Sequence, residues 1–250
     1  MPNLIKEYPK NLELVNPSDY EQLASYKFVH ITTGAAFEYS LSVPISGYPK
    51  VNYSGALLIW HFPYPQIEEQ WVTDSIKDLA QTHTAESLFD ELDNLVGLQE
   101  QHKELIGNIC FEDYPHLPVP DNSAVQIRSA YIIPEFQQYR IATQAYRFIA
   151  LHKNLVVSDN NQTPYAQKLW GNTLPQYGRV SIFNQLLMKY IGQVDPELEI
   201  DFTVWGIVSS NENYLAIKQG AVEAGVGGYK VDQDCHDVLL VFKPKSDKDA

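Results

Sequence analysis

The stretch AVQIRSAYIIPEFQQYRIATQAYRFIALH, residues 124–152, decides the fold. Its first part, Ala124–Phe136, is rich in β-branched and aromatic residues and predicts a strand. Its last part, Ile141–His152, repeats apolar residues at helical spacing. Gln137–Arg140 between them predicts a turn that opens the helix. Backbone N–H groups at a helix N-terminus commonly hold phosphate groups, so the stretch predicts a pyrophosphate site.

Strands and helices continue to alternate on the C-terminal side. Leu155–Ser158 predicts a second strand, Thr163–Leu174 predicts a second helix, and a third strand ends at Asn184. Further along we expect two more helices and two more strands: Gln185–Gly192 and Asn211–Gly220 as helices, Ile200–Val208 and Val238–Phe242 as strands. Alternation of this kind is typical of a sheet covered by helices.

The N-terminal half shows a different pattern. Residues 1–25 predict an irregular lead-in with a short helix near Ser18–Tyr26. Three strands are then expected, at Phe28–Thr32, Phe37–Val43 and Gly55–Phe62, the last as a central strand because it is apolar almost throughout. Ile67–Ile106 predicts helix, with Leu88, Phe89, Leu92 and Leu95 on one apolar stripe.

The expected fold is α+β or α/β, with a mixed central sheet flanked by helices and an N-terminal elaboration. We expect a single domain over residues 26–245, with 124–184 as its best-defined part and 246–250 as a frayed tail. At 250 residues the chain is long enough to bury a sizeable core.

Composition narrows the classes of partner. The formal net charge of −13 argues against binding duplex nucleic acid through its backbone, unless a local basic groove forms. Such a groove would draw on Arg128, Arg140, Arg147, Lys153 and Arg179. An acidic chain could also imitate DNA, but its acids are scattered. No apolar run is long enough to span a membrane and no signal peptide is evident, so we expect a cytoplasmic protein.

Cysteine and histidine spacing gives no metal or nucleophile motif. Cys110 and Cys235 lie far apart without a CxxC pattern, which indicates neither a zinc site nor a disulfide scaffold. The seven histidines form no HxxxH or HExxH pattern. His61 follows an apolar strand and is expected to be a hydrogen-bonded histidine at a sheet edge.

The order of segments resembles the GNAT superfamily of N-acetyltransferases, in a divergent branch common in phages and their hosts. In that family a long bulged strand leads into a turn patterned Arg/Gln-x-x-Gly-x-Gly/Ala at the start of a helix. Gln137 matches the first position of the turn and Ala142 the last. Ala166, Leu169 and Trp170 resemble the family's next helix, which carries an Ala-x-x-Leu-Tyr pattern.

The resemblance implies an acyl-CoA-dependent N-acyltransferase fold with acetyl-CoA as cofactor. Its pyrophosphate would be held at the turn and the start of the helix, by Ile133, Gln137, Gln138, Tyr139, Arg140, Ile141, Ala142 and Thr143. The acceptor would be a small-molecule or protein amine. A carboxylate near the sheet would accept the amine proton. Glu135, at the end of the motif strand, and Asp159, at the end of the next strand, are the candidate bases.

Two positions depart from the family. Arg140 replaces the middle glycine of the turn, where its side chain could reach a phosphate or block the cradle. Trp170 stands where many members carry a tyrosine general acid, and an indole N–H does not protonate a thiolate. Tyr165, about one helical turn earlier, is the candidate replacement, and Trp170 is otherwise expected to pack in the core.

Other functions remain open at this level. The same scaffold could be a non-catalytic protein that binds a macromolecular partner, for example in phage–host conflict. It could also modify nucleotides or nucleobases. Acceptor, oligomeric state and organism are not determined by the sequence.

Overall fold

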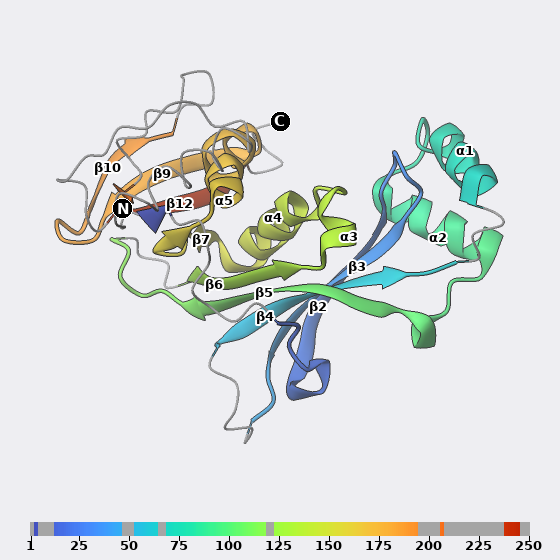
Figure 1. The fold of residues 1–250 in the computed structure, drawn as a ribbon, viewed down its shortest axis with the longest axis horizontal. Helices are drawn as coiled ribbons and strands as arrows, with labels where there is room; N and C mark the ends of the chain where they lie inside the picture. Colours follow the sequence, from blue (N-terminus) through green and yellow to red (C-terminus); the bar gives the residue numbers. More distant parts are fainter. Residues whose placement is uncertain are drawn as a thin grey trace. The chain divides into compact units, whose positions relative to one another are not determined.

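The computed structural model describes residues 3–4, 13–46, 53–64, 69–118, 123–194, 206–207 and 238–245. Its helices flank a nine-stranded mixed sheet, and a second sheet has three strands (Figure 1). The chain divides into two compact units. The N-terminal unit comprises Leu12–Cys110 and Ala130–Ala145, and the C-terminal unit comprises Met1–Asn11, Phe111–Ser129 and Tyr146–Ala250. The expectation of a single domain over residues 26–245 stays a prediction.

Four neighbouring strands begin in the N-terminal unit. In sheet order they are β5 (Glu104–Asp113), β4 (Gly55–Phe62), β3 (Ala36–Pro44) and β2 (Tyr20–Val29). β3 pairs antiparallel with both β2 and β4, and Glu38 lies opposite Lys27 on one side and Trp60 on the other. Because side chains alternate between the two faces of a strand, these three side chains share one face.

Two helices connect β4 to β5. They are α1 (Glu69–Leu79) and α2 (Ala85–Val96). The Thr84 side chain caps α2 by accepting a hydrogen bond from the Ser87 N–H, and Gly97 ends the helix in the left-handed region at φ 67°. Their apolar residues pack against strand ends in one cluster: Val29, Ala36, Phe62, Val72, Ile76, Leu88, Phe89 and Leu92.

The strands of the C-terminal unit are arranged around one parallel pair. β6 (Ala124–Ile132) begins in this unit and runs parallel to β7 (Leu155–Val157). β7 pairs antiparallel with β12 (Val238–Pro244), and β12 with β9 (Gly178–Asn184), which in turn pairs with β10 (Lys189–Gln193). Gly178 is needed because a Cβ there would collide with the carbonyl oxygen of Lys243.

The remaining elements are short, apart from one helix. α3 (Pro134–Gln137) follows β6 and α4 (Ile141–Lys153) leads to β7. α5 (Pro164–Lys168) continues into a π-helical turn, η4 (Leu169–Thr173), and a 3-10 turn, η5 (Leu174–Gln176). The three-stranded sheet has the order β11 (Gly206–Ile207), β1 (Asn3–Leu4) and β8 (Asn161–Gln162), paired in parallel.

Most of the strands and the long helix after the motif strand agree with prediction, with small shifts of their ends. β4 matches the predicted Gly55–Phe62, and α4 extends the predicted helix by one residue. The motif strand ends at Ile132 rather than Phe136, because Pro134 begins α3. The predicted strand at Phe28–Thr32 ends at Val29, because a turn begins at His30, whose carbonyl accepts the Gly34 N–H.

Two predicted helices are strands. Ser18–Tyr26 forms a 3-10 turn and then β2, whose bulge between Gln22 and Ala24 interrupts the alternation that would have indicated a strand. Gln185–Gly192 forms a turn and β10, because the Asn184 side chain accepts the Leu187 N–H and Met188 takes φ 49°.

The helical region predicted over Ile67–Ile106 consists of two helices, α1 and α2, and ends at Val96. The strand β5, which begins at Glu104, was not predicted. The predicted helix Asn211–Gly220 and most of the predicted strand Ile200–Val208 lie outside the described residues.

Candidate functional site

The turn that opens α4 lies in the N-terminal unit and is held mostly by its own chain. The Ile133 N–H donates to the carbonyl of Ile106 at 2.9 Å, and the Gln137 side chain donates to the carbonyl of Ile132 at 2.8 Å. The Gln138 amide likewise donates to the carbonyl of Glu135. Both glutamine side chains therefore stabilise the turn.

Arg140 has the backbone conformation of a glycine. Its φ is 54°, in the left-handed region that side chains with a Cβ rarely adopt, and its side chain is exposed. A glycine at this position would adopt the same left-handed conformation without strain. The exposed guanidinium of Arg140 stays accessible to a ligand. Among the described residues, the Arg140 side chain has no hydrogen-bond or ion-pair partner.

The first N–H groups of α4 are available to an anion. The Thr143 N–H donates to the carbonyl of Arg140, whereas those of Ile141 and Ala142 have no hydrogen-bond partner within the described ranges. Unpaired N–H groups and the positive end of a helix dipole favour a bound anion. α4 has 13 residues, long enough for its dipole to contribute.

Aromatic side chains anchor this turn to β3 and β4. The Phe136 ring lies 4.8 Å from the His61 ring and 6.2 Å from the Phe37 ring, measured between centroids. The Tyr139 ring lies 5.7 Å from Phe37 and 5.6 Å from His30. The turn therefore rests on the face of the sheet opposite Glu38.

Both histidines of this cluster are half-buried. Burial lowers the pKa of His30 below its ordinary value, and it lowers the pKa of His61 more than nearby Glu104 raises it. Both rings are therefore neutral at neutral pH. The buried Nδ1 of His61 has no hydrogen-bond partner in the part of the chain that the structure describes, so the expectation of a hydrogen-bonded edge histidine is wrong for this atom.

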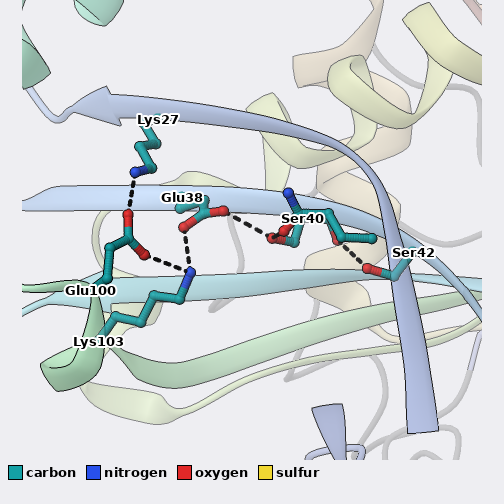
Figure 2. Close-up of polar contacts among 7 residues, drawn as sticks. Lys27, Glu38, Ser40, Ser42, Glu100 and Lys103 are labelled. Carbon is teal, nitrogen blue, oxygen red and sulfur yellow. Dashed lines mark hydrogen bonds and ion pairs between the residues drawn. The ribbon is translucent and has the colours of Figure 1, made fainter. Parts of the chain in front are cut away.

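On the opposite face of β3, a polar chain links β2, β3 and the turn that precedes β5 (Figure 2). Lys103 Nζ lies 2.8 Å from Glu38 Oε2 and 3.0 Å from Glu100 Oε2, and Glu100 also pairs with Lys27. Ser40 donates to Glu38 at 3.1 Å. The side chain of Glu38 is 3% exposed.

The two lysines and two glutamates of this polar cluster balance each other in charge. The cluster does not act as a base. Burial lowers the pKa of Lys103, but hydrogen bonds and charge from Glu38 and Glu100 outweigh burial and raise it above its ordinary value. The ammonium therefore stays protonated and does not activate the Ser40 hydroxyl. Lys103 also lies 5.1 Å from the centre of the Trp60 ring. The ion pairs of this cluster hold β2, β3 and the turn before β5 together.

In the C-terminal unit the parallel pair is short. Pairing runs from Ala124 opposite Leu155 to Gln126 opposite Val157, where β7 ends. The Gln126 amide then donates to the carbonyl of Ser158 and to the side chain of Asn160, each at 3.1 Å. The pairing therefore ends where β7 ends, and the Gln126 side chain bonds to the segment that follows β7.

Asp159 follows β7 and is 4% exposed. Its Oδ1 accepts the Asn160 N–H at 2.7 Å, as in an Asx turn. Its charge also acts on Tyr146: burial first, and Asp159 second, raise the pKa of the Tyr146 hydroxyl well above its ordinary value. Asp159 and Tyr146 therefore belong to one buried polar environment.

The two aromatic candidates on α5 and η4 differ in burial. Trp170 is 1% exposed, which confirms its predicted packing role, and its ring lies 5.6 Å from that of Tyr146. Tyr165 is 70% exposed and points away from the core. Sequence spacing missed Tyr146, because its proximity to Trp170 depends on how α4 packs.

Glu135 is exposed in the first turn of α3, and its carboxylate has no hydrogen-bond or ion-pair partner among the described residues. Cys110 is buried, and burial raises the pKa of its thiol to about 12, which excludes an activated nucleophile. No group of His, Cys, Asp and Glu within the described ranges could hold a metal ion. Among the helices described, none is long and apolar enough to cross a membrane.

Comparison of the chain with protein-family models, with curated proteins and with solved structures found no match. The structure itself shows a mixed α+β fold, a nine-stranded sheet flanked by helices.

Proposed function

We propose that the chain is a divergent GNAT-like protein that binds acetyl-CoA at the start of α4 and transfers its acyl group to an amine. The observation that carries the proposal is the turn at Arg140. A strand runs into a turn whose glycine-like position has φ 54°, and the next two N–H groups, of Ile141 and Ala142, have no partner in the described part of the chain. This arrangement suits a pyrophosphate.

The short parallel pair adds support. In open sheets, ligands bind beyond the carboxyl ends of parallel strands. β6 and β7 pair as far as Gln126 and Val157, and Asp159 lies two residues after Val157. The mixed sheet and the helix between its parallel strands agree with the fold that the resemblance implies.

The reaction needs a proton acceptor and a proton donor. The amine nitrogen attacks the thioester carbonyl and loses a proton, a C–N bond forms, and the C–S bond breaks as the thiolate takes up a proton. Asp159 and Glu135 are the candidate bases, and Asp159 is the buried one of the two, at 4% exposed. Tyr146, whose ring lies 5.6 Å from that of Trp170, joins Tyr165 as a candidate donor, and its raised pKa makes it a weaker acid than an ordinary tyrosine.

Calorimetric titration of the full chain with acetyl-CoA tests the proposal. We expect micromolar binding, and at least about tenfold weaker binding in Arg140→Glu, because the reversed charge repels the pyrophosphate. Arg179→Glu is the matched control, since Arg179 is an exposed arginine on β9. Wild-type protein that gives no heat with acetyl-CoA would contradict the proposal.

One observation favours the non-catalytic alternative. The Gln126 side chain lies where the pairing of β6 with β7 ends and donates to both Ser158 and Asn160. A cofactor arm between the strands would have to displace these bonds. A chain that binds no acetyl-CoA, with Gln126→Ala or without it, would be a binding protein on this scaffold. Binding that appears only in Gln126→Ala would indicate a closed cofactor slot.

A further inference from the structure

Gln167 is a fully buried carboxamide that finds no partner in the described part of the chain. The residue is 0% exposed, and neither its Nε2 nor its Oε1 has a hydrogen-bond partner among the described residues. The buried Oδ1 of Asn172, five residues later, also lacks one among them. An unsatisfied buried polar atom is costly, so native proteins keep few of them and each calls for an explanation.

Neighbouring buried polar residues in the same segment are satisfied. The Ser158 hydroxyl accepts the Leu240 N–H at 3.0 Å, Asp159 accepts the Asn160 N–H, and the Gln162 amide donates to the carbonyl of Asp159 at 3.0 Å. The segment therefore provides partners for its other polar groups. The unpaired carboxamide of Gln167 is a local exception.

The backbone around Gln167 is irregular. α5 ends at Lys168 and continues as a π-helical turn, in which the Leu174 N–H bonds to the carbonyl of Leu169. Such turns recur at functional sites. Gln167 and Trp170 are three residues apart and both fully buried, so they face the same side, where the Trp170 ring meets that of Tyr146.

A carboxamide offers a donor and an acceptor side by side, and the best partner for it offers the reverse pair. The amine and ring nitrogen of adenine form such an edge, which glutamine pairs with through two hydrogen bonds. The aromatic pair Tyr146 and Trp170 favours a planar ring over an aliphatic amide. The buried charge of Asp159 disfavours an anionic group in the same environment.

We propose that Gln167 is the base-reading residue of a binding site for an uncharged nucleobase or nucleoside in the C-terminal unit. The proposal does not depend on acyl transfer or on the turn at Arg140. Because Gln167 is covered, binding requires displacement of α5, which has five residues, together with η4. This displacement exposes the ring of Trp170, which is 1% exposed in the structure, so the bound base must cover that ring again by stacking on it.

Titration calorimetry of the full chain with adenosine tests the proposal, and purine riboside, which lacks the exocyclic amine, serves as the comparison ligand. We expect adenosine to bind the wild type and purine riboside to bind at least about tenfold more weakly, a loss of about 1.4 kcal/mol. Gln167→Met, which keeps the side-chain volume without the amide, should weaken adenosine binding by a similar factor.

Gln101→Met is the matched control, because Gln101 is exposed and lies in the N-terminal unit. It should bind adenosine as the wild type does. Absence of adenosine binding to the wild type, equal affinity for both ligands, or unchanged affinity in Gln167→Met would each overturn the proposal. The ligand comparison uses wild-type protein, so the test holds even if the variant does not fold.

Discussion

The hydroxyl of Tyr39 donates a hydrogen bond to the carbonyl oxygen of Ile141 at 2.7 Å. Tyr39 lies on β3 and is 0% exposed, and Ile141 is the first residue of α4. A side chain from the sheet therefore fixes where the helix starts, about a hundred residues later in the chain. The same bond sets the position of the candidate anion-binding N–H groups.

Removing this hydroxyl should destabilise the N-terminal unit. In Tyr39→Phe the carbonyl of Ile141 loses the donor from Tyr39 but keeps the i+4 N–H of its own helix, so we expect the free energy of unfolding to fall by about 0.5–1.5 kcal/mol. Urea denaturation followed by circular dichroism measures the change. Tyr165→Phe, at a tyrosine that is 70% exposed, should stay within about 0.5 kcal/mol of the wild type. Equal losses in the two variants would contradict this assignment.

Replacing Arg140 by glycine should stabilise the protein. The left-handed φ of 54° strains a residue with a Cβ, and glycine removes that strain. We expect the free energy of unfolding to rise by up to about 1 kcal/mol. Arg179→Gly is the opposite case, since glycine in the strand β9 should lower it by about 0.5–1 kcal/mol. If Arg140→Gly destabilises as much as Arg179→Gly, the turn does not have this conformation.

Loss of Lys103 should be severe, because it leaves Glu38 buried without its cation. We expect Lys103→Met to lower the free energy of unfolding by about 3 kcal/mol, and the double variant with Glu38→Gln to recover part of it. Lys77→Met is the matched control: its pair with Asp74 is exposed and should contribute less than about 1 kcal/mol. Additive losses in the Lys103/Glu38 cycle would show that the two side chains do not interact.

Stability should fall as pH decreases from neutral toward 5. Burial places the pKa of His30 and His61 below 6.5 in the folded protein, so the unfolded chain binds their protons more readily. Their contribution is complete above the unfolded pKa and is lost as pH falls through the folded pKa. Each group contributes at most about 1.4 kcal/mol per pH unit. Denaturation at several pH values measures the slope.

His61→Gln should reduce that pH slope, because it removes one of the two titrating rings. The same substitution at His116, which is exposed, should leave the slope as in the wild type. A wild-type stability that is constant over this range would show that burial does not hold the rings neutral.

The local pattern of apolar and polar residues predicted two kinds of element: strands that are buried along their whole length, and helices whose apolar spacing is uninterrupted. β4 is apolar almost throughout, and α4 keeps its helical spacing. The pattern failed at β2, where a bulge between Gln22 and Ala24 breaks the alternation, and at β10, where every residue is exposed. In both cases pairing with a neighbouring strand decides the structure, and pairing partners are not visible in a local window.

The sequence by itself determined the order of the strand, turn and helix at residues 124–152, because propensity and periodicity act over neighbouring residues. Only the tertiary structure decided which side chains meet. It brings Tyr146 against Trp170 and links Lys27 and Glu38 through Glu100 and Lys103. It also leaves the carboxamide of Gln167 buried without a partner among the described residues. Burial and hydrogen bonding depend on contacts between segments far apart in the chain, and these contacts exist only in the folded protein.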